Sequence, residues 1–200
     1  ANAATDSSDY VVSDDGQIVV FSSRATNLIS NPGFQDLNGP GNQDLYYYSR
    51  VTGEMTLLSN SAVLPTTGDG PSYRPSMSAD GRFVVFQTDA TNIAGTHPNG
   101  GIVLFDSQNG KTFLGEGQDA RISADGSTVV FVSSDGSLVP GTTKLNGSAG
   151  LNVYAYHVQT QTYTLVSHAA LNVNDSGFQL SFRYNTVAER KLRTMDVVHV

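Results

Sequence analysis

Oxygen-bearing side chains gather in one glycine-containing stretch of the sequence, between residues 36 and 44. Asp36, Asn38 and Asp44 supply carboxylate and amide oxygens, which are the ligands that Ca²⁺ prefers in proteins. The stretch lacks the bidentate Glu of a helix-loop-helix calcium site, and Asx residues also form turns by bonding to their own backbone. A metal-free, Asx-rich loop is therefore the simpler interpretation, and a calcium site is the alternative. No other cofactor is expected.

The sequence contains no arrangement that is typical of nucleophilic catalysis. It has no cysteine and no Gly-x-Ser-x-Gly motif, and its four histidines form no pattern. These are His97, His157, His168 and His199. Residues 115–120 formally fit the dinucleotide-binding motif Gly-x-Gly-x-x-Ala, but that motif must open a helix and another strand pattern follows here. We therefore expect surface or partly packed histidines, no catalytic residue and no enzymatic activity in this segment.

Three consecutive tyrosines, at positions 46–48, offer an aromatic surface. Alternation along a strand places Tyr47 on the face opposite Tyr46 and Tyr48. Packing between sheets is the expected use of such residues, and an exposed platform for a sugar or a peptide is the alternative. Asn146 and Asn174 each begin an Asn-x-Ser sequence, which is a glycosylation acceptor only in a suitable secretory host.

The composition excludes several classes of partner. The 200 residues carry a formal net charge of -7, which argues against nucleic acid or an anionic membrane as the main partner. No apolar run reaches the length of about 20 residues that a membrane helix needs. Zero cysteines also exclude disulfides and thiolate metal sites.

Three copies of one pattern organise the chain. Each copy has Ser, one residue, Asp-Gly, two residues and then Val-Val-Phe, and the copies begin at Ser13, Ser78 and Ser123. Asp-Gly provides the positive φ of a tight hairpin, while Val-Val-Phe is typical of a buried strand. Asp15, Asp80 and Asp125 are accordingly expected to have structural roles in turns.

Two further strands are expected in each copy. An aromatic or aliphatic strand is followed by a polar turn and a last strand, over residues 44–59, 101–115 and 151–167. Four short strands joined by hairpins make an antiparallel sheet that cannot bury its faces alone, so neighbouring sheets must stack on one another. The fold class is therefore all-β, with repeats over about 9–70, 71–116 and 117–176.

These motifs resemble the WD-like repeats of TolB-type β-propellers. The similarity rests on Ser-x-Asp-Gly-x-x-Val-Val-Phe, an Ala-Thr-Asn-Leu loop, the aromatic strand and Thr-Leu-Leu-Ser, and it covers about residues 9–167. It implies three complete propeller blades of four antiparallel strands each, in a protein that is secreted or periplasmic in a bacterium.

The last part of the chain departs from the repeat. Residues 177–200 contain no Asp-Gly and no Val-Val-Phe, and they hold four of the eleven Lys and Arg residues. We expect an atypical C-terminal segment or the start of a fourth blade, in a partial propeller or a fragment of a larger protein. Residues 197–200 are a candidate final strand.

The sequence favours a non-enzymatic, extracytoplasmic propeller module for binding or assembly. One alternative is the accessory propeller of a larger secreted hydrolase, such as a peptidase, whose catalytic domain lies outside this segment. Another is a structural repeat stabilised by calcium. The expected partners are a protein or a glycan, or a second copy bound through unclosed blades, with no nucleic acid and no membrane insertion.

Overall fold

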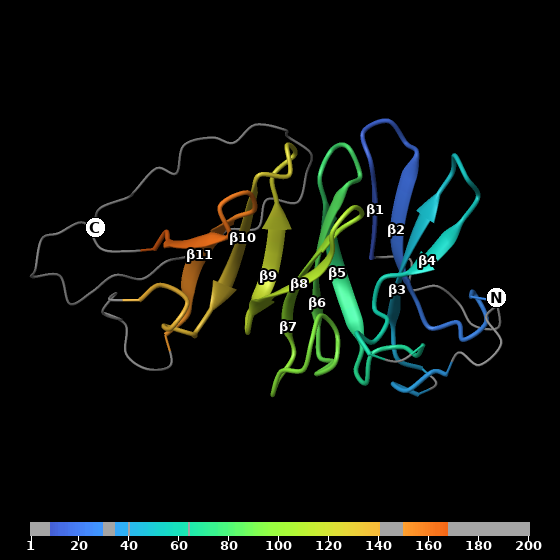
Figure 1. Ribbon diagram of the computed structural model, residues 1–200, viewed down its shortest axis with the longest axis horizontal. Helices are drawn as coiled ribbons and strands as arrows, with labels where there is room; N and C mark the ends of the chain where they lie inside the picture. Colours follow the sequence, from blue (N-terminus) through green and yellow to red (C-terminus); the bar gives the residue numbers. More distant parts are fainter. Residues whose placement is uncertain (1–8, 30–34, 40, 64, 141–149, 168–200) are drawn as a thin grey trace, which may run out of the picture. The chain divides into compact units, whose positions relative to one another are not determined.

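Every regular element of the described chain is a β-strand (Figure 1). The computed structural model describes residues 9–29, 35–39, 41–63, 65–140 and 150–167. Over these ranges no helix is long and apolar enough to cross a membrane. The predicted segment 177–200, including the candidate strand 197–200, lies outside the described residues, as do His168, His199, Asn146 and Asn174.

Within the described ranges, twelve strands form three separate four-stranded sheets. The first sheet contains β1 (Tyr10–Val12), β2 (Ile18–Ser23), β3 (Asp44–Ser49) and β4 (Met55–Leu57). The second contains β5 (Ser72–Met77), β6 (Phe83–Thr88), β7 (Gly101–Asp106) and β8 (Gly110–Gly115). The third contains β9 (Gln118–Ile122), β10 (Thr128–Ser133), β11 (Asn152–His157) and β12 (Thr162–Leu165). Each sheet keeps its strands in sequence order, and all neighbours are antiparallel.

The sheets have the up-and-down order of propeller blades, which confirms the predicted fold class. We call them blades 1, 2 and 3 in chain order. Within the described residues the first and third sheets are not joined, so the blades do not close into a ring.

The repeated Ser-x-Asp-Gly segments form the turns that lead into β2, β6 and β10. In blade 1, Ser13 Oγ donates to Asp15 Oδ1 at 2.6 Å, and the Gln17 backbone N–H donates to the same oxygen at 2.9 Å. Blades 2 and 3 repeat both bonds around Asp80 and Asp125. Since Gly16, Gly81 and Gly126 have φ between 68° and 74°, these positions favour glycine.

Blade 2 is buried on both faces because alternate residues of β6 point to opposite neighbours. Val84 and Phe86 belong to the apolar cluster shared with blade 1, while Val85 belongs to the cluster shared with blade 3. Burying one such side chain contributes about 1.5–3 kcal/mol. Tyr47 packs against the first of these clusters, and its ring contacts that of Phe105 at an interplanar angle of 60°, so it has the predicted role between blades.

Adjacent turns are also joined by backbone hydrogen bonds. The N–H of Asp14 donates to the Ala79 carbonyl, and the N–H of Ala79 donates to the Ala124 carbonyl, both at 2.8 Å. The three Asp-Gly turns therefore lie in a row at the same end of their blades.

Candidate functional site

One charged residue per blade stands four positions before the repeated Ser. These are Asp9, Arg74 and Asp119. Arg74 and Asp119 have φ of 55° and 56°, values that residues other than glycine seldom adopt, and the pairing of β5 with β6 and of β9 with β10 shifts at these positions. Each is thus a bulge in the first strand of its blade, and bulges commonly turn side chains toward a site.

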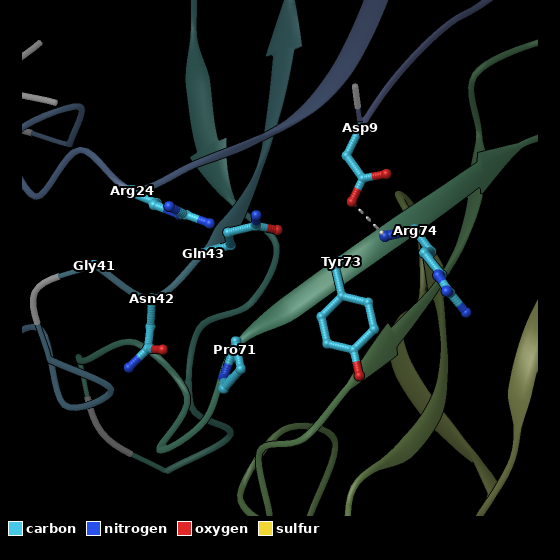
Figure 2. A pocket seen from close by; sticks show the side chains of 8 residues that line it. All are labelled: Asp9, Arg24, Gly41, Asn42, Gln43, Pro71, Tyr73 and Arg74. Carbon is cyan, nitrogen blue, oxygen red and sulfur yellow. Dashed lines mark hydrogen bonds between the residues drawn. The ribbon is translucent and has the colours of Figure 1, made fainter. Parts of the chain in front are cut away.

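The three residues are linked in a row from blade to blade. The Arg74 backbone N–H donates to Asp9 Oδ2 at 3.1 Å (Figure 2). The Arg74 guanidinium extends away from Asp9 and pairs with Asp119, with 2.7 Å between Nη1 and Oδ1. Residues of alternating charge at equivalent positions of three blades are therefore linked in a row, through the backbone N–H of Arg74 on one side and its guanidinium on the other.

A polar pocket of about 380 Å³ opens beside this row, between blades 1 and 2. Figure 2 shows the side chains that line it. Charged groups come from Asp9, Arg24 and Arg74, and amides come from Asn42 and Gln43, which precede β3. Tyr73 adds its ring and phenol from β5. The lining thus offers hydrogen-bond donors and acceptors with little apolar surface.

A second hollow of about 300 Å³ occupies the equivalent place between blades 2 and 3. Asp89 stands there at the position of Arg24, and Gly100 at that of Gln43. The Tyr73 hydroxyl donates to Asp89 Oδ1 at 2.7 Å. Burial and this bond to the carboxylate raise the pKa of Tyr73 to about 12, so the phenol remains a donor at neutral pH. A hollow therefore recurs at both junctions, with the positive Arg24 at the first and the negative Asp89 at the second.

Equivalent positions of β2 and β6 each have a buried polar atom without a partner. Ser22 Oγ in β2 and Gln87 Oε1 in β6, one in each blade, are both in this state. Most buried polar atoms have partners, so such atoms are informative. Gln87 lines the second hollow directly.

Two of the predicted calcium ligands, Asn38 and Asp44, are in contact where β3 begins in blade 1, and Asp36 lies in the preceding loop. Asn38 Nδ2 donates to Asp44 Oδ1 at 3.2 Å, and the charge of Asp36 acts on Asp44. Burial, with a smaller contribution from Asp36, raises the pKa of Asp44 to about 6. Asp36 Oδ1 accepts the N–H of Gly39 at 3.1 Å, as an Asx turn requires. No group of three or more His, Cys, Asp or Glu side chains that could hold a metal occurs among the described residues.

The histidines and the Gly-x-Gly-x-x-Ala stretch of the described chain take part in packing and strand formation. His97 is buried, stacks on Phe113, and has both ring nitrogens within 2.8 Å of backbone carbonyl oxygens. His157 lies in β11 and contacts the Thr164 hydroxyl. The Gly-x-Gly-x-x-Ala stretch runs from the end of β8 into β9, which is a strand and not a helix.

Sequence reasoning missed the row of Asp9, Arg74 and Asp119. Their common distance from the repeated Ser is a signal that the sequence contains, because all three positions carry a charge. Pro75 is a second signal, since proline inside a strand pattern is confined to edges and bulges.

Comparison with solved structures finds propellers. TolB from Acinetobacter baumannii is 18% identical with a TM-score of 0.45, and the match covers 85% of this chain and 33% of that chain. The putative TolB from Agrobacterium tumefaciens is 18% identical with a TM-score of 0.49, over 81% and 46%. The β-propeller domain of the Trilobed protease from Pyrococcus furiosus is 9% identical with a TM-score of 0.47, over 78% and 40%.

This likeness concerns the fold alone. The chain spans between a third and a half of the length of these three proteins. No protein-family model matches the sequence, and comparison with curated proteins finds no match.

Proposed function

We propose that this propeller module is a non-enzymatic, extracytoplasmic binding protein that holds a polar segment of a partner protein at the pocket between blades 1 and 2. The observation that carries the proposal is the row of Asp9, Arg74 and Asp119. Left-handed backbone at a residue with a side chain costs free energy, and two blades keep it at equivalent positions. The left-handed backbone turns these charged side chains outward, and binding of a partner would explain why this unfavourable conformation is kept.

The charges of the pocket indicate the chemistry of the segment. Arg24, Arg74 and Asp9 line the pocket. The Asp9 carboxylate already accepts the Arg74 N–H, and the Arg74 guanidinium pairs with Asp119. The positive charge at the pocket itself is thus that of Arg24, in a chain whose net charge is -7. Guanidinium groups bind carboxylates with charge-assisted hydrogen bonds, and the neighbouring amides of Asn42 and Gln43 suit a peptide backbone. An acidic peptide segment is the partner that fits.

The proposed location outside the cytoplasm rests on the resemblance of the repeats to TolB-type propellers. The Ser-, Thr- and Asn-rich composition, with only 14% charged residues, is compatible with it. Fractionation of cells that express the full-length gene product, with detection by antibody, tests this part of the proposal separately from binding.

The binding proposal is tested by amide chemical-shift mapping of the ¹⁵N-labelled chain with a glutamate-rich decapeptide. The expected shifts cluster at Arg24, Asn42, Gln43, Tyr73 and Arg74. Arg24→Ala is expected to weaken binding about 10-fold or more, because the variant loses one charge-assisted hydrogen bond to the peptide. Arg50→Ala is the matched control, because Arg50 is an exposed arginine that does not line the pocket and whose guanidinium bonds to the Gly16 carbonyl.

Three outcomes would contradict the proposal. A lysine-rich decapeptide that shifts the same amides equally would show that charge does not select the ligand. A glucose oligosaccharide that binds there in place of the peptide would assign the pocket to a glycan. Shifts spread over the surface, weakened equally by Arg24→Ala and Arg50→Ala, would indicate unspecific attraction.

A further inference from the structure

Asp44 has a structural role that does not require its negative charge. Ser59 Oγ donates to Asp44 Oδ1 at 2.7 Å, and the Leu45 N–H donates to Ser59 Oγ at 3.1 Å. Blade 3 builds the same arrangement with a neutral residue, since Ser167 Oγ donates to Asn152 Oδ1 at 3.3 Å. The Val153 N–H likewise donates to Ser167 Oγ at 2.9 Å. The fold of a blade therefore does not require a negative charge at the position of Asp44.

The surroundings of Asp44 make that charge costly. The residue is only 5% exposed, and the second carboxylate acting on it, that of Asp36, has the same sign. The groups that shift the pKa of Asp44, apart from its burial, are Ser59, Asp36 and Asn38, and none of them is a cation. A buried carboxylate that feels a second negative charge and no cation is disfavoured.

Asn38 adds an oxygen that lacks a partner. The residue is 9% exposed, its Nδ2 bonds to Asp44, and its Oδ1 is buried without any hydrogen bond. Nδ2 and Oδ1 belong to one planar group, so the unpartnered oxygen is on the same amide whose nitrogen contacts the buried carboxylate. Rotation of the amide by half a turn would place Oδ1 against Asp44, an arrangement that a cation between the two oxygens would favour.

We propose that Asp36, Asn38 and Asp44 form a calcium site at the edge of blade 1. Carboxylate and carboxamide oxygens are hard ligands, and Ca²⁺ accepts irregular sets of them completed by backbone carbonyls and water. A bound Ca²⁺ neutralises the two like charges and gives Asn38 Oδ1 its missing partner. The site has no counterpart in the other blades, where Gly101 and Asn152 take the place of Asp44. It is separate from the polar pocket and does not depend on the proposed function.

The test is thermal unfolding of the whole chain, first freed of metal with a chelator and then titrated with CaCl2. We expect the melting temperature to rise with Ca²⁺ and to fall again with excess chelator. With two carboxylates the expected Kd is about 0.1–1 mM, as in extracellular calcium modules. Asp44→Asn is expected to abolish the response while still folding, because Asn152 performs the same structural role in blade 3. Asp36→Asn removes the second charge from a less buried position and is expected to weaken Ca²⁺ binding as well.

Terbium luminescence provides a readout independent of stability. The chain has no tryptophan, and Tyr46 lies within electrostatic range of both carboxylates, since burial first and then Asp44 and Asp36 raise its pKa. Tb³⁺ bound at the site is expected to emit when tyrosine is excited. Tyr46→Phe should reduce this emission without changing the concentration of Ca²⁺ that displaces Tb³⁺.

Glu54→Gln is the matched control, because Glu54 is an exposed carboxylate at the turn before β4. It is expected to keep the full Ca²⁺ response. The proposal is overturned if metal-free wild-type protein shows no Ca²⁺ response. It is equally overturned if Asp44→Asn and Asp36→Asn respond like the wild type. A melting temperature that depends on pH but not on Ca²⁺ would assign Asp44 to proton binding alone.

Discussion

Lys111 is a cation that bonds to three oxygen atoms and to no carboxylate. Its Nζ, extended from β8 of blade 2, lies 3.0 Å from the Leu58 carbonyl, 2.6 Å from the Asn60 carbonyl and 2.7 Å from Asn60 Oδ1. All three acceptors belong to the segment that follows β4 of blade 1. One side chain therefore fastens the outer part of blade 1 to its neighbour.

Burial lowers the pKa of Lys111 from 10.5 to about 8. Between these two values the unfolded chain binds more protons than the folded chain, so the free energy of unfolding should rise as the pH rises from 8 to 10.5. Lys111→Met should remove this rise. At neutral pH it should cost less than the roughly 1.5–3 kcal/mol of the lost charged hydrogen bonds, because the variant also removes the desolvation of the ammonium. Urea unfolding at a series of pH values measures both effects.

Arg50→Met removes a positive charge at an exposed position and should leave the alkaline rise unchanged. If the rise persists in Lys111→Met, another group is responsible for it. If that variant is as stable as the wild type at neutral pH, the three bonds contribute nothing net.

Only part of this residue-scale chemistry could be predicted from the sequence. Asp15, Asp80 and Asp125 were assigned to turns because they recur at fixed positions, and the turn geometry depends on local atoms alone. The partners of Lys111 lie more than 50 residues away, so no local pattern reveals them. Asp36, Asn38 and Asp44 are close in sequence, so the sequence predicts them in one loop. The unpartnered oxygen of Asn38 depends on the folded surroundings, so the sequence does not reveal it.

At the scale of elements, the Asp-Gly turns of blades 2 and 3 each pack against a side chain of the preceding blade. A Cβ on Gly81 would lie 2.7 Å from Ile18 of blade 1, and a Cβ on Gly126 would lie 2.5 Å from Phe83 of blade 2. Ile18 and Phe83 stand at equivalent positions, two residues after their own Gly. Glycine is thus required here for close packing as well as for its positive φ.

Gly53 permits these two requirements to be separated. Gly53 and Gly126 both have φ of 72°, but a Cβ on Gly53 would meet nothing within 4 Å. Gly53→Ala should cost about 1–2 kcal/mol for the left-handed backbone alone. Gly126→Ala should cost a further 1–3 kcal/mol, roughly, because Phe83 must move in a packed junction. Guanidinium unfolding of the two variants gives the difference, and equal losses would show that the contact with Phe83 is not needed.

The strands were predictable because Val-Val-Phe and the aromatic strands form periodic local patterns. The bulges at Arg74 and Asp119 were not, because a bulge depends on the register between two strands. The pocket beside them results from two blades meeting, so the sequence of one repeat does not contain it.

At the scale of the whole molecule, each junction between blades places the Phe of one Val-Val-Phe strand toward the preceding blade. Phe86 of blade 2 packs toward blade 1, and Phe131 of blade 3 packs toward blade 2. Phe21 is the equivalent residue of blade 1, and neither apolar cluster includes it. On the same face Tyr10 pairs with Phe21 and Val12 with Val19, and Tyr10 and Val12 are 64% and 58% exposed.

Blade 3 presents the complementary half of such a junction. Val20 and Val85 pack toward the following blade, whereas Val130, at the equivalent position, is 39% exposed. Blade 1 exposes a face with Tyr10 and Val12, and blade 3 exposes a face with Val130. These two faces are therefore complementary in the same way as the two faces that meet at each existing junction. A contact between two such different faces on separate copies is heterologous, so it adds copies head to tail.

We expect the chain to self-associate at high concentration, with Val12 of one copy against Val130 of the next. Val12→Lys should weaken association about 10-fold or more, because a desolvated lysine would face an apolar partner and a shift of 1.4 kcal/mol is one decade in Kd. Sedimentation equilibrium over a range of concentrations measures this. Val51→Lys is the control, since Val51 is 74% exposed at a turn and outside the face. Equal weakening by both substitutions, or a monomer at every concentration, would rule out the face of blade 1 as the contact between copies.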